Sequence, residues 1–408
     1  MSRQPLLQRS AAEWGVRVVL ALLLAAIAFF GIARTTAYAL REKDLALAHV
    51  MAPSDGRITA LKAETLLQSG VTADNVRTIE RFAVQALRQD PTAVAAASAL
   101  GIIKQTRGDA AGAQRMLAYA ERLSRRHLQT QLWAIEEAVA KGDISQALRH
   151  YDIALRTSRQ APDLLFPVLE KSIADPTVRA ALVRTLAARP AWSTSFLDHI
   201  AGTAPDQAAT AELYVALHRI GVEASQGAQA EVIDTLIARG NHDAAWQLYR
   251  EIRPSARRDR ARDPRFALLL DHPTPFDWVP VNGTGISSSI QRNNDAGLFD
   301  FVVSSGVGGV VLSQRQLLAP GVYHLKGHSI GIDLPEDARP YWALACGDGE
   351  ERGNVDVPNS DQAGGFFTGQ LIVPADCPVQ TLMLVVRPSY KVGGGAGQID
   401  QIELMPAR

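Results

Sequence analysis

Few residues in this 408-residue chain are arranged as catalytic groups would be. The sequence contains no GxSxG nucleophile elbow, no GxxxxGKS/T phosphate loop and no HExxH zinc motif. A glycine-rich stretch, SSGVGG at 304–309, lacks the strand-to-helix context of a phosphate loop, so we interpret it as a plain loop. Paired catalytic carboxylates come from distant positions, and no residue here points to such a pair. We therefore predict a protein that is not an enzyme and carries no cofactor.

Metal-ligating residue types are present, but their spacing does not favour a shared ion. His324 and His328 are four residues apart, which is about 13 Å on a strand. The acidic run at 347–361 offers the oxygen ligands that calcium prefers but matches no defined calcium loop. We interpret it as a flexible acidic loop and leave calcium binding open. Two cysteines, Cys346 and Cys377, cannot supply the four ligands of a structural zinc site. No metal site is predicted.

The elements that carry these residues change character near Pro273. Residues 274–408 hold 8 Lys and Arg against 14 Asp and Glu, whereas residues 1–273 hold 34 against 28. The same C-terminal part contains 19 of the 31 glycines, while Ala, Leu, Arg and Gln fill the first part. This contrast predicts a helical domain followed by a β domain. The basic excess of the first part is too small to indicate nucleic-acid binding.

An apolar segment, VVLALLLAAIAFFGIA at 18–33, follows an N-terminal tail at 1–17. Sixteen helical residues span about 24 Å, and small flanking residues extend the tolerable membrane-spanning segment to 18–37. We predict a single membrane anchor. A cleaved signal peptide is the alternative, because AYA at 37–39 fits a cleavage site. Three basic residues lie on each side, so charge gives no orientation, but a short tail before one helix favours export of the bulk.

A 34-residue period runs through the helical part. The recurring pairs are Gly108-Asp109 and Gly142-Asp143, Ala113 and Ala147, Leu117 and Tyr151, and Ala120 and Ala154. Small residues let the two helices of a hairpin cross closely, and the Gly-Asp pair turns the chain between them. This register resembles the tetratricopeptide repeat, a helix–turn–helix unit of 34 residues. Lys104 and Ile135 depart from the residues usual in that family.

The predicted repeats lie at 60–93, 94–127, 128–161 and about 226–259. Gly142 and Gly240 are 98 residues apart, four short of three periods, so we interpret residues 162–225 as degenerate helical hairpins. The helical domain is predicted to cover 45–266. The resemblance implies a solenoid surface that binds a protein partner, and the alternative is a spacer between the membrane and the C-terminal domain.

Seven arginines lie in REIRPSARRDRARDPR at 250–265. Glu251, Asp259 and Asp263 partly balance their charge, and clusters of mixed sign usually face solvent. We interpret the run as a solvated helix end and linker. Attraction to an acidic polymer or to lipid headgroups is the alternative.

Short strand-like runs alternate with Gly, Pro, Asn and Asp clusters from Phe276 onward. The runs are FDWVPV, GISSSIQ, GLFDFVVSS, GVVLSQRQL, GVYHLKGHSIGI, YWALACG, GFFTGQLIV, TLMLVVRPS and QIDQIEL. Their spacing predicts an antiparallel sandwich or jelly roll over 274–408. Three segments, QRQLLAPGVYHL, GGFFTGQLIVPADCPVQTLMLVV and GQIDQIEL, resemble the carbohydrate-binding, galactose-binding-like jelly rolls, although these motifs mark the scaffold rather than the sugar site. The whole layout, with PFDW and WALAC, resembles proteins of bacterial exopolysaccharide gene clusters.

Strand alternation separates core from outer positions in this domain. The positions assigned to the core are Trp278, Tyr323, Leu325, Trp342, Leu344, Phe367, Leu371 and Val373. If the strands are neighbours, one outer face combines His324, Tyr341, Phe366, Gln370 and Arg387. Aromatic rings for the C–H faces of sugars and fixed polar groups for their hydroxyls suit a glycan. An ordinary solvated sheet face is the alternative.

The two cysteines both fall in the β domain. In an exported domain, two otherwise isolated cysteines favour a disulfide between Cys346 and Cys377. Closing a loop of about 30 residues contributes roughly 3–4 kcal/mol in the chain-entropy model. Two unpaired buried thiols are the alternative.

Together these features predict a non-catalytic adaptor in the bacterial inner membrane, with one membrane-spanning helix and its bulk in the periplasm. The repeats would dock a protein partner and the jelly roll a polysaccharide, in exopolysaccharide synthesis or export. A pure assembly scaffold without sugar binding is the second interpretation. A polysaccharide-modifying enzyme is the third.

Overall fold

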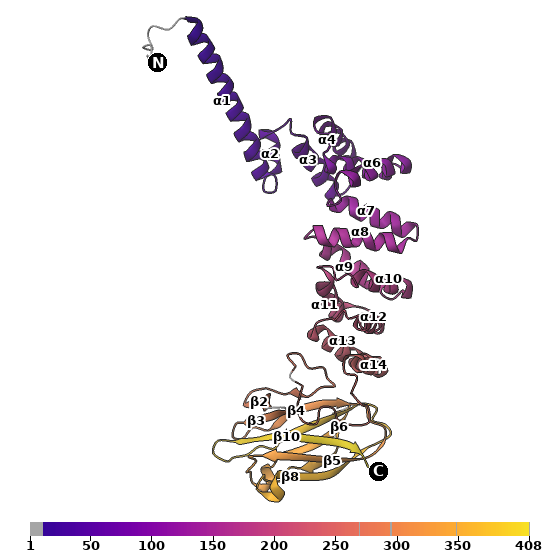
Figure 1. Cartoon of the computed structure of the whole chain (residues 1–408), viewed down its shortest axis with the longest axis vertical. Helices are drawn as coiled ribbons and strands as arrows, with labels where there is room; N and C mark the ends of the chain where they lie inside the picture. Colours follow the sequence, from indigo (N-terminus) through magenta and orange to yellow (C-terminus); the bar gives the residue numbers. More distant parts are fainter. Residues whose placement is uncertain (1–10, 269, 294–295, 348, 408) are drawn as a thin grey trace. The chain divides into compact units, whose positions relative to one another are not determined.

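The computed structural model describes residues 11–268, 270–293, 296–347 and 349–407. In this part of the chain helices α1 to α14 precede strands β1 to β10 (Figure 1). The chain divides into two compact units, Met1–Ala161 and Pro162–Arg408. The order of elements confirms the predicted fold class: an apolar N-terminal helix, then helical hairpins, then a β-sandwich.

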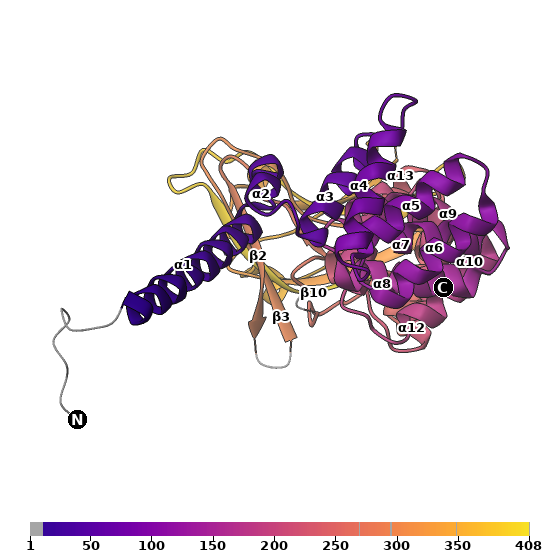
Figure 2. The ribbon, with the colours of Figure 1, turned by 90° about the horizontal axis from the view of Figure 1, so that it is seen from above.

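Helix α1 (Ala11–Leu40) is the one helix among the described residues that is long and apolar enough to cross a membrane, properties that a signal sequence shares. Figures 1 and 2 show it as a single rod extending away from α2 (Leu45–Met51). Its side chains from Ala12 to Ile32 are exposed on all sides.

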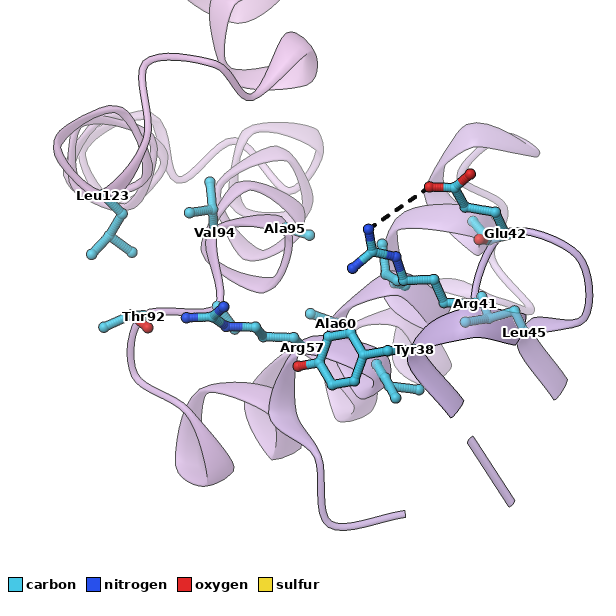
Figure 3. Close-up of a pocket in the computed structure, with 14 residues that line it drawn as sticks. Tyr38, Arg41, Glu42, Leu45, Arg57, Ala60, Thr92, Val94, Ala95 and Leu123 are labelled. Atoms are coloured by element: carbon cyan, nitrogen blue, oxygen red, sulfur yellow. Dashed lines mark ion pairs between the residues drawn. The ribbon is translucent and has the colours of Figure 1, made fainter. Parts of the chain in front are cut away.

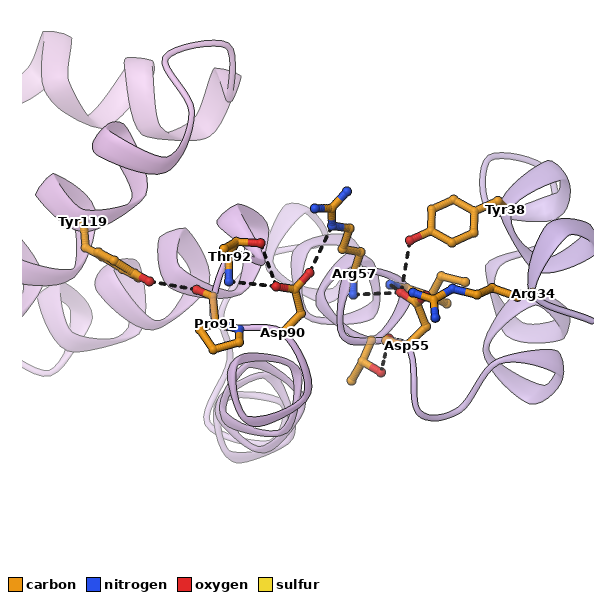
Figure 4. A network of polar contacts seen from close by, with 10 residues as sticks. Arg34, Tyr38, Asp55, Arg57, Asp90, Pro91, Thr92 and Tyr119 are labelled. Carbon is orange, nitrogen blue, oxygen red and sulfur yellow. Dashed lines mark hydrogen bonds and ion pairs between the residues drawn. The ribbon is translucent and has the colours of Figure 1, made fainter. Parts of the chain in front are cut away.

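The last two turns of α1 pack against α2 and the start of the helical hairpin that follows it. Ala37 is fully buried in a cluster with Ala48 and its neighbours. The Tyr38 hydroxyl donates to Asp55 Oδ1 at 3.3 Å, and Arg34 Nη2 lies 2.7 Å from Asp55 Oδ2 (Figure 4). Asp55 is also the N-cap of the next helix, so α1 is tied to the residue from which the hairpins begin.

The following helices pair as hairpins. The first unit contains α3 (Gly56–Gln68) with α4 (Val76–Gln89), α5 (Val94–Thr106) with α6 (Ala110–Leu123), and α7 (Leu128–Ala140) with α8 (Ile144–Thr157). The second contains α9 (Ala161–Ser172) with α10 (Pro176–Leu186), α11 (Ser193–Thr203) with α12 (Gln207–Arg219), and α13 (Gln226–Ala238) with α14 (His242–Ile252). From α5 on, the first helices begin at residues 94, 128, 161, 193 and 226. The predicted hairpins at 162–225 are confirmed, and the four-residue deficit is spread over three repeats.

The Gly-Asp pairs form the turns between hairpin helices, as the 34-residue period predicted. Gly108 and Gly142 have φ of 80° and 69°, the left-handed conformation that ends a helix at low cost. The aspartate after each glycine then caps the second helix: Asp109 accepts from Gly112 N at 2.8 Å and Asp143 from Gln146 N at 3.0 Å. Each pair therefore closes one helix and opens the next within two residues.

Gly101 of α5 marks a close crossing of hairpin helices. A Cβ at this position would lie 2.4 Å from Cγ of the fully buried Leu117 of α6. We expect Gly101→Ala to destabilise this hairpin by about 1–3 kcal/mol through overpacking, although alanine is the better helix former. Hydrogen-exchange protection of the α5 and α6 amides measures the effect. Gly31→Ala, whose Cβ would meet nothing within 4 Å, is the control. Equal protection in the two variants would contradict the close crossing.

The C-terminal strands form a sandwich of two antiparallel five-stranded sheets. Sheet A has the order β1 (Val279–Pro280), β4 (Gly309–Gln316), β9 (Gln380–Val386), β6 (Tyr341–Cys346) and β7 (Glu351–Asp356). Sheet B has the order β2 (Ile286–Asn293), β3 (Ala296–Val303), β10 (Gly395–Pro406), β5 (Gly321–Ile330) and β8 (Phe366–Val373). The predicted core residues, from Trp278 to Val373, are all buried between the sheets. The nine predicted runs each contain a strand.

Strand β7 corrects the interpretation of 347–361 as a flexible loop. Residues 351–356 pair with β6 at the edge of sheet A. Four of these six residues are exposed in succession and only Val355 is buried, so too few residues alternate to reveal the strand. Backbone pairing at the edge, rather than burial, makes it a strand.

The predicted disulfide is present. Cys346, at the end of β6, bonds to Cys377, in the turn before β9, with their Cα atoms 5.5 Å apart. Because β6 and β9 are neighbours in sheet A, the bond ties the turn before β9 to the end of the adjacent strand.

The segment 253–266, which the sequence placed in the helical domain, lies against the sandwich. Ala261 N donates to Leu404 O at 3.1 Å, and Ile402 N donates to Pro264 O at 2.9 Å. Phe266 is fully buried in the sandwich core. The segment therefore runs beside β10 and is not a free linker.

Arg262 contradicts the interpretation of the arginine run as solvated. Its Nε donates to Phe276 O at 2.9 Å, and its Nη1 donates to Gln316 Oε1 at 2.9 Å. Its guanidinium also lies 5.7 Å from the ring centroid of Trp246 in α14. Burial lowers the pKa of this guanidinium to about 10, so it stays charged at neutral pH. An arginine so enclosed joins the last hairpin to the sandwich, because its partners come from both.

Candidate functional site

The structure does not bring the five predicted glycan-binding residues together. His324 and the pair Phe366 and Gln370 lie on β5 and β8 of sheet B, whereas Tyr341 begins β6 of sheet A and Arg387 follows β9. The predicted single face is therefore wrong. The chain changes sheets between β5 and β6 and again between β8 and β9, and strand alternation alone cannot show this.

Tyr341 and Arg387 hold each other and the edge strand β7. The Arg387 guanidinium lies 4.3 Å from the centroid of the Tyr341 ring. The Tyr341 hydroxyl donates to Glu351 Oε1 at 3.1 Å, and Arg387 Nη2 donates to Asp356 Oδ1 at 2.8 Å. Burial and the nearby Glu351 carboxylate raise the pKa of Tyr341. Arg387 thus covers one face of the Tyr341 ring, and the Tyr341 hydroxyl and the Arg387 guanidinium both bond to residues of β7. These contacts indicate that the pair stabilises the edge of sheet A.

The other three residues belong to a wider outer surface of sheet B. Strands β8, β5 and β10 run side by side (Figure 1), and their outer residues line up in three cross-strand rows. The rows are Phe366–His328–Gln401, Thr368–Lys326–Glu403 and Gln370–His324–Met405. We call these nine residues the three-row face. His324, Phe366 and Gln370 lie within it, as alternation predicted.

A hollow of about 370 Å³ lies on the three-row face. Its lining includes Lys326, Phe366, Thr368, Gln401 and Glu403. Phe366 is 61% exposed, which is unusual for a large aromatic ring in a sheet. The hollow thus combines an open ring with an ammonium, a hydroxyl, an amide and a carboxylate, the mixture that fixes a polar ligand with apolar faces.

The Phe366 ring is held from one side. The His328 ring lies 4.5 Å away between centroids, at 45°. His328 Nδ1 is 2.7 Å from Asp400 Oδ1, and its Nε2 is 3.1 Å from Gly364 O. The register of β10 shifts between Ile399 and Gln401, at Asp400. His328 therefore has acceptors at both nitrogens and forms a fixed support for the exposed ring.

Two polar groups of the hollow are also oriented. Gln401 Nε2 donates to Glu403 Oε1 at 2.9 Å, and Thr368 Oγ1 donates to Leu325 O at 3.1 Å. The sequence-based selection missed Lys326, Thr368, Gln401 and Glu403. Alternation did place Lys326 and Thr368 outward, but only the strand order shows that β10 supplies the other two.

No protein-family model matches the chain, and no curated protein matches it. Among solved structures, a carbohydrate-binding module of the CBM4 type is similar to 36% of this chain over 99% of its own length, with 10% identity and a TM-score of 0.27. The CBM22-1 xylan-binding domain from Paenibacillus barcinonensis is similar to 37% of this chain over 97% of its length, with 14% identity and a TM-score of 0.24. The TPR protein YrrB, described as having an unusual peptide-binding site, is similar to 52% of this chain over 94% of its length, with 16% identity and a TM-score of 0.25. These similarities are too weak to assign the chain to a family.

Proposed function

We propose that this protein is a non-catalytic, membrane-anchored adaptor with its bulk in the periplasm. In this proposal the helical hairpins dock a protein partner and the three-row face binds a polysaccharide, in exopolysaccharide synthesis or export. The observation that carries it is the open, supported ring of Phe366 beside the polar groups of the hollow.

The three-row face has the dimensions of an oligosaccharide site. Neighbouring strands are about 4.8 Å apart, so the face extends roughly 10 Å from β8 to β10. The apolar C–H face of one sugar would stack on Phe366, and the hydroxyls of the next would reach Lys326 and Glu403. A glycan chain laid across the strands would use all of these groups.

A retained anchor is part of the proposal. Cleavage after AYA at 37–39 would remove Ala37 and Tyr38, which are packed and hydrogen-bonded into the first hairpin, together with Arg34. Those contacts support a helix that stays attached to the mature protein.

An exposed apolar pair supports a protein partner on the hairpins. Leu164 and Val168 lie one turn apart on α9 and are 52% and 56% exposed. Apolar side chains of this size on neighbouring turns are what a docked partner covers.

Phe366→Ala is expected to weaken binding to a recognised polysaccharide about fivefold, because a stacked aromatic contact is worth on the order of 1 kcal/mol. The full chain in detergent is tested by affinity electrophoresis against a panel of bacterial exopolysaccharides and xylan. Phe366→Tyr, which keeps the ring, should bind as the wild type does. Tyr390→Ala removes another exposed aromatic side chain, outside the face, and should also change nothing. Retardation by no polymer would favour a pure assembly scaffold, and equal losses in Phe366→Ala and Tyr390→Ala would reject this face as the site.

A further inference from the structure

A pocket of about 590 Å³ lies in the first unit, where α1 ends. Its walls are the end of α1 with the start of α2, one side of α3, the first turn of α5 with the loop before it, and the end of α6 (Figure 3). The proposed adaptor function does not use this pocket. Its position beside the apolar helix makes its chemistry informative.

Two guanidinium groups reach into the pocket. Arg57 donates through Nε to Asp90 Oδ2 at 3.0 Å, a bond that does not use its two terminal nitrogens (Figure 4). Arg41 is paired more loosely, with its Nη2 3.8 Å from Glu42 Oε1 and its guanidinium 5.6 Å from the Tyr38 ring centroid. Figure 3 shows the Arg57 guanidinium beside Thr92 and the Arg41 guanidinium on the Glu42 side, so the two cations lie at different places along the lining. Such an arrangement suits an anionic headgroup that presents several oxygens.

The remaining walls are mostly apolar. Leu45, Leu61, Val94 and Leu123 line the pocket beside the two arginines. A small hydrated anion would leave this surface uncovered, whereas an amphiphile would place its charged group on the arginines and its first methylenes on the leucines. The lining therefore favours a ligand with both parts.

The pocket is also at the right height for a lipid. The predicted membrane-spanning segment ends at residue 37, and a rise of 1.5 Å per residue places Tyr38 and Arg41 about 2 and 6 Å beyond it. The headgroup layer on each side of a bilayer is about 5–8 Å deep. A lipid beside α1 could thus keep its chains in the membrane while its headgroup enters the pocket. This step rests on the proposed membrane attachment.

We propose that the pocket binds the phosphate headgroup of an anionic lipid from the membrane in which α1 lies. Arg41 and Arg57 contact oxygens of this headgroup from two places along the lining, and the apolar wall covers the first carbons of the lipid. The lipid would then fix the first hairpin at the membrane surface.

The test uses the delipidated full chain in detergent, titrated with dioleoyl phosphatidylglycerol or dioleoyl phosphatidylcholine and observed by native mass spectrometry. We expect one phosphatidylglycerol to bind at least tenfold more tightly than phosphatidylcholine. The double variant Arg41→Gln with Arg57→Gln should lose this preference. So should Ala95→Trp, which fills the pocket without changing charge. The preference should survive in Arg77→Gln with Arg115→Gln, which removes two exposed arginines of the same unit.

Asp90→Asn serves as a further control, because it breaks the ion pair of Arg57 and leaves the pocket cation in place. It should keep the preference for phosphatidylglycerol. Equal affinity for both lipids, or equal loss in the exposed-arginine control, overturns the proposal. Displacement of the lipid by the same concentration of inorganic phosphate or of a hexaglutamate peptide also overturns it, in favour of a soluble anion or an acidic partner.

The intact mass of the same samples separates this proposal from the membrane attachment on which it rests. A mass that includes residues 1–39 shows that the helix is retained, so that a missing lipid preference then counts against the pocket alone. A mass lacking them overturns the anchor and the pocket together, and the glycan test on the three-row face is unaffected by either result.

Discussion

Arg262→Ala is expected to destabilise the junction between α14 and the sandwich by about 3–5 kcal/mol, one of the larger effects a single substitution can have. The substitution removes the donors to Phe276 O and Gln316 Oε1, both in buried surroundings. Each acceptor then loses its hydrogen bond without gaining water. Amide hydrogen exchange of α14 and β4 in the full chain should show loss of protection on both sides of the junction.

Two comparison variants make this result specific. Arg257→Ala removes a neighbouring arginine whose side chain is largely exposed and paired with Asp259, and it should change protection little. Arg262→Lys keeps the charge but loses the planar fork that serves several acceptors at once, so it should retain only part of the protection. Equal behaviour of Arg262→Ala and Arg257→Ala would mean that Arg262 is not buried as described.

Removing the disulfide should have an effect of similar size. For a sequence separation of 31 residues, the chain-entropy model assigns the Cys346–Cys377 bond roughly 3–4 kcal/mol. We expect the double variant Cys346→Ser with Cys377→Ser to lose exchange protection in β6 and β9. The three-row face is in the other sheet, so binding there should weaken only as the sandwich begins to unfold.

Reduction of the wild-type protein is the matched experiment. Oxidised wild type should be the most protected form, and reduced wild type should resemble the double variant. If reduction leaves the protection of β6 and β9 unchanged, the bond is not what stabilises this end of sheet A.

The sequence predicts those elements whose residues repeat with a regular period. The Gly-Asp turns at Gly108 and Gly142 recur because each hairpin needs one left-handed residue and one cap, so the repeats follow from local chemistry. Strands with one buried face, such as the one containing Tyr323, follow from alternation. Strand β7 does not, because its first four residues are exposed in succession and only Val355 is buried.

Arg262 and the candidate site depend on information that a linear pattern does not contain. In the sequence, Arg262 cannot be distinguished from the other arginines of its run. It is buried because Phe276 and Gln316, which come later in the chain, accept its hydrogen bonds. Likewise, Phe366 and Tyr341 occupy outward positions on their strands, yet they belong to different sheets. Alternation gives the side of a strand on which a residue lies, and the crossovers decide which other residues share that side.

The segment beside β10 would lie in the path of any force applied to a polymer at the three-row face. Ala261 and Pro264 are bonded to Leu404 and Ile402, which flank Glu403 of the three-row face. Tension on a polymer held at that face would enter the strand to which the segment is bonded and pass through Arg262 into α14. The last helical hairpin is therefore linked to the strand that carries the three-row face by hydrogen bonds as well as by the covalent chain.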